Sequence, residues 1–160
     1  MSTKISRSQW EAHAKSLTIR SQAFINGKYV DAASGKTFSC ISPIDGACIA
    51  QVAECAEEDV NRAVSAARHA FEAGYWSTSS PVHRKKVLQK FALLIEQHAE
   101  ELALLESIDM GKPVADALSI DVSASVRCLT WTAEAVDKVY GEIAPTPNHE
   151  LGLITREPLG

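Results

Sequence analysis

The sequence has little that would suit a membrane or nucleic-acid partner. No apolar run approaches the roughly 18–20 residues that span a bilayer, so no membrane partner is expected. Lys and Arg number 16 against 20 Asp and Glu, a net charge of -4, which leaves no basic surface for nucleic acid. The stretch from Met1 to Arg7 lacks the apolar segment of a secretory signal, which predicts a cytoplasmic protein.

Short catalytic and metal-binding motifs are also missing. The chain contains no G-x-G-x-x-G, P-loop, H-E-x-x-H or G-x-S-x-G sequence, and no C-x-x-C pair. The four cysteines are expected to be reduced and to pack as small buried side chains, and the five histidines to lie at the surface. The residues alone therefore show no nucleophile with its base and no cofactor loop. The cysteines are Cys40, Cys48, Cys55 and Cys128, and the histidines are His13, His69, His83, His98 and His149.

What is present is ordinary globular patterning, with 46% apolar and 22% charged residues. Asn26-Gly27 between two apolar pairs predicts a type I′ hairpin over residues 23–30. Strands are predicted over residues 37–41 and 47–53, joined by a turn that contains Pro43 and Gly46. The first third of the chain is thus expected to be a small antiparallel β region, preceded by a helix over 8–19 in which Ser8 and Glu11 form a capping box.

Helical periodicity begins at Glu57, where the apolar spacing changes from two to 3.6. Helices are predicted from Glu57 to just before Gly74, from Pro81 with Ser80 as N-cap, and over residues 100–108. A long helix is predicted over 114–140, ending at Gly141. It carries two apolar stripes, one from Val114 through Leu118 and Val122 to Tyr140, the other made of Ile120, Ala124, Cys128 and Trp131.

A helix that is apolar on two sides needs partners on two sides. The predicted helices can cover one, so a further layer is expected from another chain or from sequence beyond Gly160. Residues 151–156 read as a strand in which Leu151, Leu153 and Thr155 alternate.

Three collinear motifs carry a family resemblance. They are Phe24-Ile25-Asn26-Gly27-Lys28, the segment from Leu105 to Pro113 that includes Asp109-Met110-Gly111-Lys112-Pro113, and Arg156-Glu157-Pro158-Leu159-Gly160. In this order and spacing the chain resembles the N-terminal part of the aldehyde dehydrogenase superfamily, and within it the bacterial γ-glutamyl-γ-aminobutyraldehyde dehydrogenases of putrescine breakdown.

The resemblance implies an α/β fold of the aldehyde dehydrogenase type. It implies a helical extension over residues 1–22, the N-terminal part of the cofactor-binding domain over 23–142 as β hairpins followed by a helical layer, and the start of the oligomerisation strands over 143–160. The implied parent is an NAD- or NADP-dependent enzyme that oxidises an amino- or γ-glutamylamino-aldehyde and assembles as a dimer or tetramer. The family's nucleophilic cysteine, glutamate and dinucleotide motif match no residue here, so the chain alone is expected to be inactive.

The resemblance also carries over two sets of site residues. Cys40 and Ile41, through backbone oxygens, and Asp109, through its carboxylate, match a monovalent-cation site; a loop carboxylate bonded to nearby backbone N–H groups explains Asp109 equally well. Ile120 and Ala124 match positions that line the substrate tunnel, although ordinary helix packing also accounts for Ile120. A non-catalytic shortened paralogue that acts as an assembly module is the alternative to an enzyme segment.

Overall fold

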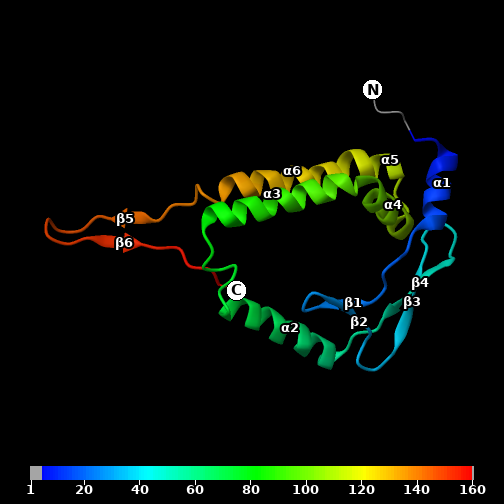
Figure 1. The fold of residues 1–160 in the computed structure, drawn as a ribbon, viewed down its shortest axis with the longest axis horizontal. Coiled ribbons are helices and arrows are strands. Elements are labelled where there is room, and N and C mark those ends of the chain that lie inside the picture. The colour runs from blue at the N-terminus through cyan, green and yellow to red at the C-terminus, as the bar shows by residue number, and fades with distance from the viewer. Residues whose placement is uncertain (1–4, 160) are drawn as a thin grey trace.

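The computed structural model describes residues 5–159, which form an open arrangement of helices and three separate β hairpins (Figure 1). Met1–Lys4 of the predicted N-terminal extension and Gly160 of the last motif lie outside the described residues. Along the chain the helices are α1 (Arg7–Ser16), α2 (Glu57–Glu72), α3 (Pro81–Gln97), α4 (Ala99–Met110), α5 (Val114–Asp116), the π-helical segment η1 (Ala117–Val122) and α6 (Ser123–Ala135). The strands are β1 (Ala23–Ile25), β2 (Lys28–Val30), β3 (Thr37–Ile41), β4 (Cys48–Ala53), β5 (Glu142–Ala144) and β6 (Gly152–Ile154).

The β region follows the sequence prediction closely. Asn26 and Gly27 have φ of 50° and 75°, the two left-handed residues that a type I′ turn requires between β1 and β2. The strands β3 and β4 pair antiparallel, with Phe38 opposite Val52 and a register shift between Cys40 and Ile41. A β-bulge of this kind bends the hairpin locally, and here it does so beside α4.

Several helix ends differ from those predicted. Ser6, not Ser8, caps α1, because Ser6 and Gln9 form a Ser-x-x-Gln capping box two residues before the predicted box of Ser8 and Glu11. Ser80 caps α3 as predicted, its Oγ accepting a hydrogen bond of 3.2 Å from the His83 N–H. The long helix over 114–140 was predicted wrongly in two respects: it contains the π-helical segment η1, and it ends at Ala135 rather than at Gly141.

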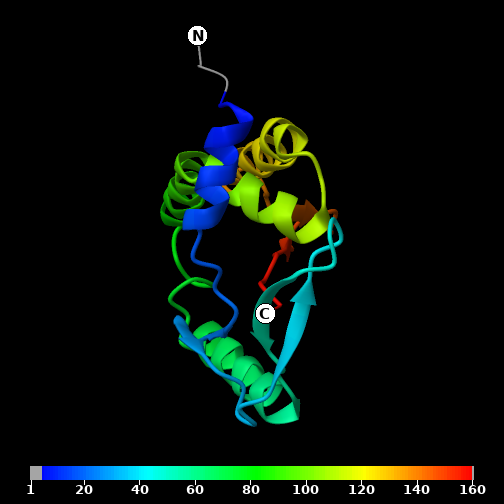
Figure 2. The same ribbon diagram turned by 90° about the vertical axis from the view of Figure 1, so that its right-hand side faces the viewer.

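The layer of helices forms around the contact between α3 and α6, which run side by side in both ribbon views (Figures 1 and 2). Where α4 meets η1, Ala103 and Ala117 are fully buried and Val122 is nearly so. These small side chains let the two helical backbones approach closely. Leu118 and Val114 flank this cluster, so the first predicted stripe of the long helix is the one that packs inward.

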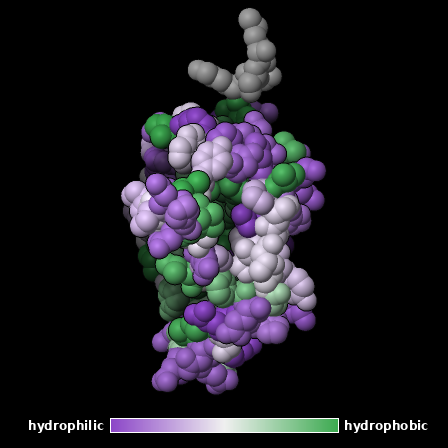
Figure 3. All heavy atoms as spheres, turned by 90° about the vertical axis from the view of Figure 1, so that its left-hand side faces the viewer, coloured by the Kyte–Doolittle hydropathy of each residue, from purple (hydrophilic) through white to green (hydrophobic). Residues whose placement is uncertain are grey.

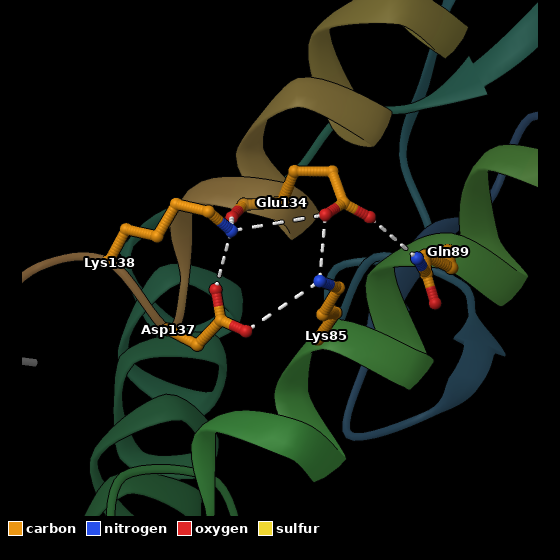
Figure 4. A network of polar contacts seen from close by, with 5 residues as sticks. All are labelled: Lys85, Gln89, Glu134, Asp137 and Lys138. Carbon is orange, nitrogen blue, oxygen red and sulfur yellow. Dashed lines mark hydrogen bonds and ion pairs between the residues drawn. The ribbon is translucent and has the colours of Figure 1, made fainter.

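A five-residue polar network links α3 to the end of α6 (Figure 4). Lys85 Nζ lies 2.7 Å from Glu134 Oε2 and 3.6 Å from Asp137 Oδ2, while Gln89 donates to Glu134 and Lys138 lies 2.8 Å from Asp137 Oδ1. The hydrogen bond from Lys85 lowers the pKa of Glu134, that from Lys138 lowers the pKa of Asp137, and the bond to Glu134 raises the pKa of Lys85.

The network should make stability depend on pH. A carboxylate whose pKa is lowered in the folded state stabilises it above the ordinary carboxyl pKa of about 4, and this contribution is lost as the pH falls through the lowered value. Lys85, whose pKa is raised by the bond to Glu134, contributes below its ordinary pKa of about 10 for as long as Glu134 and Asp137 stay ionised. We therefore expect Lys85→Met to destabilise the chain at neutral pH and to flatten the loss of stability between about pH 5 and pH 2.

Urea unfolding followed by circular dichroism at several pH values measures this effect. Lys86→Met, at an exposed neighbour that makes no ion pair within residues 5–159, is the matched control and should keep the wild-type pH profile. Because the network is partly exposed, added salt should shrink the difference between the two variants. An identical pH profile for Lys85→Met and Lys86→Met would count against the network.

Large parts of the helices remain uncovered. Of the described residues, the buried apolar ones are Ala32, Ala92, Ala103, Leu104, Ala117, Val122 and Ala133, so almost no large side chain is fully enclosed. The accessible surface is 12142 Å², whereas a compact protein of 17.3 kDa exposes about 7,800 Å². In Figure 3 green apolar patches accordingly lie in the middle of the face, between the purple polar ends.

The hairpin of β5 and β6 projects beyond the paired ends of α3 and α6 (Figure 1). Arg156 closes its base by donating to the Tyr140 carbonyl at 3.0 Å and to Glu142 at 3.3 Å. A Cβ on Gly141 would lie 2.6 Å from the Ile154 carbonyl oxygen, so only glycine fits between the two strands there. This close approach, and not the helix cap that the sequence pattern predicts, explains the glycine at position 141.

Candidate functional site

Two of the three predicted cation-site residues come together in space although 69 residues separate them. The Cys40 thiol, at the end of β3, donates to Asp109 Oδ1 on α4 at a distance of 3.3 Å. Ile41 follows directly, at the register shift of the hairpin, and its side chain is 52% exposed. The β3–β4 bulge and the last turn of α4 therefore place the three residues at one junction.

At this junction the Asp109 carboxylate, whose oxygens can bind a cation, lies beside the neutral thiol of Cys40. The hydrogen bond to Asp109, with some desolvation, raises the pKa of Cys40, so the thiol stays protonated near neutral pH. Within residues 5–159 no backbone N–H bonds to the Asp109 carboxylate, and only its Oδ1 accepts a hydrogen bond. Asp109 Oδ2 is thus left available to a hard cation, which prefers oxygen ligands.

A cavity of about 420 Å³ opens between the β3–β4 hairpin and α4 at this junction. Its walls are mainly apolar, with Arg20, Glu106 and Asp109 as the charged members. The cavity is lined by Ile19, Arg20, Cys40, Ile49, Ala50, Val52, Leu105, Glu106, Ile108, Asp109 and Met110. Cys40 and Asp109 are among these residues and Ile41 is not, so two of the three predicted cation-site residues line the cavity.

The predicted tunnel residues lie elsewhere, on the side of the long helix that no other described element covers. Ile120, in η1, is 54% exposed, and Ala124, in the first turn of α6, is exposed as well. Trp131, further along the same stripe, is 73% exposed. Packing within this chain therefore does not account for Ile120, and the second apolar stripe is open as the sequence indicated.

The remaining cysteines and histidines form no site among residues 5–159. Cys48, Cys55 and Cys128 are exposed, so the prediction that they are buried was wrong, because they lie on faces that the chain does not cover. None of the four cysteines is in a disulfide, and all five histidines are exposed as predicted. In this described part no group of three or more His, Cys, Asp or Glu side chains could hold a metal ion, and no helix is both long and apolar enough to cross a bilayer.

Asp59 is a structural residue that the sequence reasoning missed. It is 2% exposed and accepts hydrogen bonds from the Ala33 N–H at 3.0 Å and the Ala56 N–H at 3.2 Å. These two bonds, the Ala56 bond first, lower the pKa of Asp59. The carboxylate therefore caps α2 and ties it to the turn after β2. Its position three residues after Ala56 is the acidic half of a capping box, a signal that the sequence prediction of this helix did not use.

The chain as a whole is similar in sequence to known proteins. Residues 29–160 match the sequence model of the aldehyde dehydrogenase family. The chain is 51% identical over 151 residues to the NADP/NAD-dependent aldehyde dehydrogenase PuuC of Escherichia coli K12, a match that covers 94% of this chain and 30% of PuuC.

Solved structures extend the likeness to the backbone. The P. syringae indole-3-acetaldehyde dehydrogenase AldA, in complex with NAD⁺, superposes with a TM-score of 0.95 at 52% identity over 98% of this chain and 32% of that one. The γ-glutamyl-γ-aminobutyraldehyde dehydrogenase of Burkholderia cenocepacia J2315 gives 0.93 at 51% identity, covering 96% and 31%. The chain thus spans about a third of the length of the relatives that it matches.

Proposed function

Because the chain belongs to the aldehyde dehydrogenase family, we propose that it forms the N-terminal segment of an NAD- or NADP-dependent enzyme that oxidises an aldehyde to a carboxylic acid. The observation that supports this most strongly is the agreement in sequence and backbone over nearly the whole chain with AldA, which was crystallised with NAD⁺. The exposed apolar faces of α2 and α6 support it too, because the relatives are about three times as long as this chain and have further sequence to cover such faces.

None of the described residues is proposed to act on the substrate or to hold the dinucleotide. The described glycines stand singly, at turns, after a helix or in the hairpin of β5 and β6, and none belongs to a glycine-rich loop that opens a helix and could cradle a phosphate. When bound in the whole enzyme, the nicotinamide accepts the hydride that leaves the aldehyde carbon. The role of this segment is to support that site, to line the approach to it and to contribute to assembly in the cytoplasm.

The substrate class that we propose is a long, polar aldehyde, of the amino- or γ-glutamylamino type met in putrescine breakdown. The B. cenocepacia relative, a γ-glutamyl-γ-aminobutyraldehyde dehydrogenase at 51% identity, supports this class. Ala124 supports it as well, because a methyl side chain at a tunnel position leaves room that a larger side chain would fill.

A chimera tests the substrate class. In this PuuC chimera, residues 1–160 replace the matching segment of E. coli PuuC, and kcat/KM is measured for γ-glutamyl-γ-aminobutyraldehyde, a short amino-aldehyde and an unsubstituted aliphatic aldehyde. We expect the polar aldehydes to be preferred over the aliphatic one by about tenfold or more, since lost polar contacts cost that much or more. An active chimera that prefers the aliphatic aldehyde would contradict the proposal.

We also propose that Cys40 and Ile41, through their backbone oxygens, and Asp109, through its carboxylate, bind a monovalent cation. The free Oδ2 of Asp109 beside the register shift of β3 supports this, although further oxygen ligands are needed from other segments. Crystals of the PuuC chimera soaked with Tl⁺ should give an anomalous peak beside Asp109, and Asp109→Asn should remove most of it. The absence of a peak in the unsubstituted chimera would end this proposal.

The hairpin of β5 and β6 is proposed to join a neighbouring subunit in a homodimer or homotetramer. Both of its outer edges lack a partner strand among the described residues, and Ile143, Leu151 and Leu153 are each more than half exposed. Unpaired edges with apolar side chains favour strand addition.

A charge placed on this hairpin should weaken assembly. In the PuuC chimera, Leu153→Lys should lower the molar mass measured by light scattering after size exclusion, because it sets a charge where an apolar side chain would be covered. His149→Lys, which adds a similar charge at the exposed loop, is the control and should leave the mass unchanged. Equal masses for the two variants would place the subunit contact elsewhere.

A further inference from the structure

Two contacts join the end of α4 to the β3–β4 hairpin. In the first, the Cys40 thiol donates to Asp109 Oδ1 at 3.3 Å. In the second, Gly111, the residue directly after α4, lies against the turn between the two strands, where a Cβ added to it would be 3.2 Å from Pro43 Cγ. Ile41, whose carbonyl the proposed function assigns to the cation, therefore lies between the two contacts along the hairpin.

The second contact needs glycine for two separate reasons. Gly111 ends α4 with a φ of 75°, a left-handed conformation in which its N–H donates to the Ser107 carbonyl at 3.0 Å. It also meets Pro43 at a distance that leaves too little room for a Cβ. Gly46, in the hairpin turn, has nearly the same φ of 73°, but a Cβ there would meet nothing within 4 Å. Conformation alone explains Gly46, whereas close packing is an additional requirement at Gly111.

The turn that carries Pro43 is closed by several hydrogen bonds. The Ser42 N–H donates to the Ala47 carbonyl at 2.8 Å, and the Gly46 N–H donates to the Ser42 carbonyl at 3.0 Å. The Ser42 hydroxyl accepts a further hydrogen bond of 3.2 Å from the Ile44 N–H. The ring of Pro43 also fixes its own φ angle. Pro43 therefore cannot swing aside unless the turn opens.

The loop after α4 is held in place as well. The Ser107 hydroxyl donates to the Lys112 carbonyl at 2.6 Å in a partly buried hydrogen bond. The Lys112 side chain forms an ion pair with Asp121 of η1. Because both partners of the second contact are fixed, a Cβ added to Gly111 would push α4 and the hairpin apart, and the first contact would open with them.

We propose that Gly111 is a positioning residue for the cation site: its missing Cβ lets α4 approach Pro43 closely enough to hold the Asp109 carboxylate beside Cys40 and Ile41. This inference rests on the proposed function, in which these three residues bind a monovalent cation. Ligands of such a site have to be held to within about 0.5 Å. A Cβ at 3.2 Å forces its neighbour to shift by a few tenths of an ångström, which is comparable with this tolerance.

The test measures the rise in unfolding temperature that K⁺ causes in the PuuC chimera and its variants. Choline chloride replaces KCl in the reference buffer, so that the ionic strength stays constant. We expect Gly111→Ala to weaken K⁺ binding by about fivefold, which halves the rise at a K⁺ concentration of about ten times the dissociation constant. Gly46→Ala, which introduces the same left-handed strain without the close contact, is the matched control and should keep the full rise.

A second substitution separates the contact from the strain. Pro43→Ala removes the Cγ atom that the added Cβ would meet, and the remaining neighbours lie at ordinary contact distances of 3.4 and 3.8 Å. Pro43→Ala alone should keep the rise. In the double variant Gly111→Ala/Pro43→Ala the rise should return, whereas the unfolding temperature without K⁺ stays below that of the unsubstituted chimera, because the left-handed strain remains.

The outcomes separate this inference from the proposal on which it rests. If K⁺ gives no rise in the unsubstituted chimera, or if Asp109→Asn keeps the full rise, the cation site fails and the positioning role with it. If Asp109→Asn loses the rise but Gly111→Ala behaves like Gly46→Ala, the site stands and the positioning role is wrong. A double variant in which the rise does not return would also overturn the role of the contact. Should Gly111→Ala not fold, Gly111→Asn, which adopts a left-handed backbone more readily and carries the same Cβ, must show the same loss.

Discussion

Replacing Ala103 with leucine is expected to lower the free energy of unfolding of the chain by about 1–3 kcal/mol. Ala103 is fully buried on α4 and packs in the same cluster as Ala117, which is fully buried as well. The contact between the two helices depends on these small side chains, so the three added carbon atoms must push α4 away from η1. The buried core is small, so this is a large share of the stability available to the chain.

Urea unfolding followed by circular dichroism measures the effect, and the midpoint should fall by about 1 M. Ala12→Leu, at an exposed site on α1, is the control, because it makes the same substitution in a helix without disturbing a packed contact. Its midpoint should stay close to that of the wild type. Equal midpoints for Ala103→Leu and the wild type would mean that α4 and η1 do not pack as the structure shows.

Introducing phenylalanine at Ala124 is expected to narrow the proposed tunnel. In the PuuC chimera, Ala124→Phe should reduce kcat/KM for γ-glutamyl-γ-aminobutyraldehyde relative to a short aliphatic aldehyde by about tenfold or more, because a bulky ring excludes the longer chain. The side chain is exposed in this segment, so the substitution does not overpack the α3–α6 contact.

Steady-state kinetics with the two aldehydes provides the measurement. Ser125→Phe, at the neighbouring exposed position, is the matched control. It adds the same ring one residue further around the helix, and so away from the proposed tunnel wall. If the ratio of kcat/KM values is the same in Ala124→Phe and the unsubstituted chimera, Ala124 does not line the approach of the substrate.

Local patterns predicted the hairpins and most helices because their causes are local. The Asn26-Gly27 turn follows from two left-handed φ angles, and the start of α3 from the Ser80 cap and Pro81. The contact of Cys40 with Asp109 could not be derived from spacing, since it depends on how β3 and α4 pack across 69 residues. The family resemblance brought those two residues together, and the structure places them in contact.

The π-helical segment is the main feature that the sequence reasoning missed, although a signal was present. The steps of four from Val114 to Val126 are too long for one face of a straight α-helix, whereas the predicted stripe treats them as one face. The predicted helix also runs to Tyr140, because Val136 and Tyr140 continue the apolar pattern and Gly141 resembles a helix cap. In the structure Tyr140 is 73% exposed and Gly141 serves the hairpin instead, so apolar spacing alone overestimated the length of the helix.

The open surface connects the fold to the proposed function. Apolar spacing indicated that one face of the long helix lacked a partner, and the exposed fractions of Ile120 and Trp131 agree with this. The face of α2 that carries Val60 and Val64 is similarly open. An accessible surface area so far above that of a compact protein of this mass is expected of a segment that packs against further structure.

The central claim is that this chain supports catalysis as the N-terminal segment of an NAD(P)-dependent aldehyde dehydrogenase. The most direct test is the rate of NADH or NADPH formation, followed at 340 nm, by the purified PuuC chimera and by the isolated 160-residue chain. We predict a rate for the chimera within about tenfold of PuuC itself and no turnover by the isolated chain. A folded chimera without turnover would contradict the account and favour an assembly module, and turnover by the isolated chain would contradict it equally.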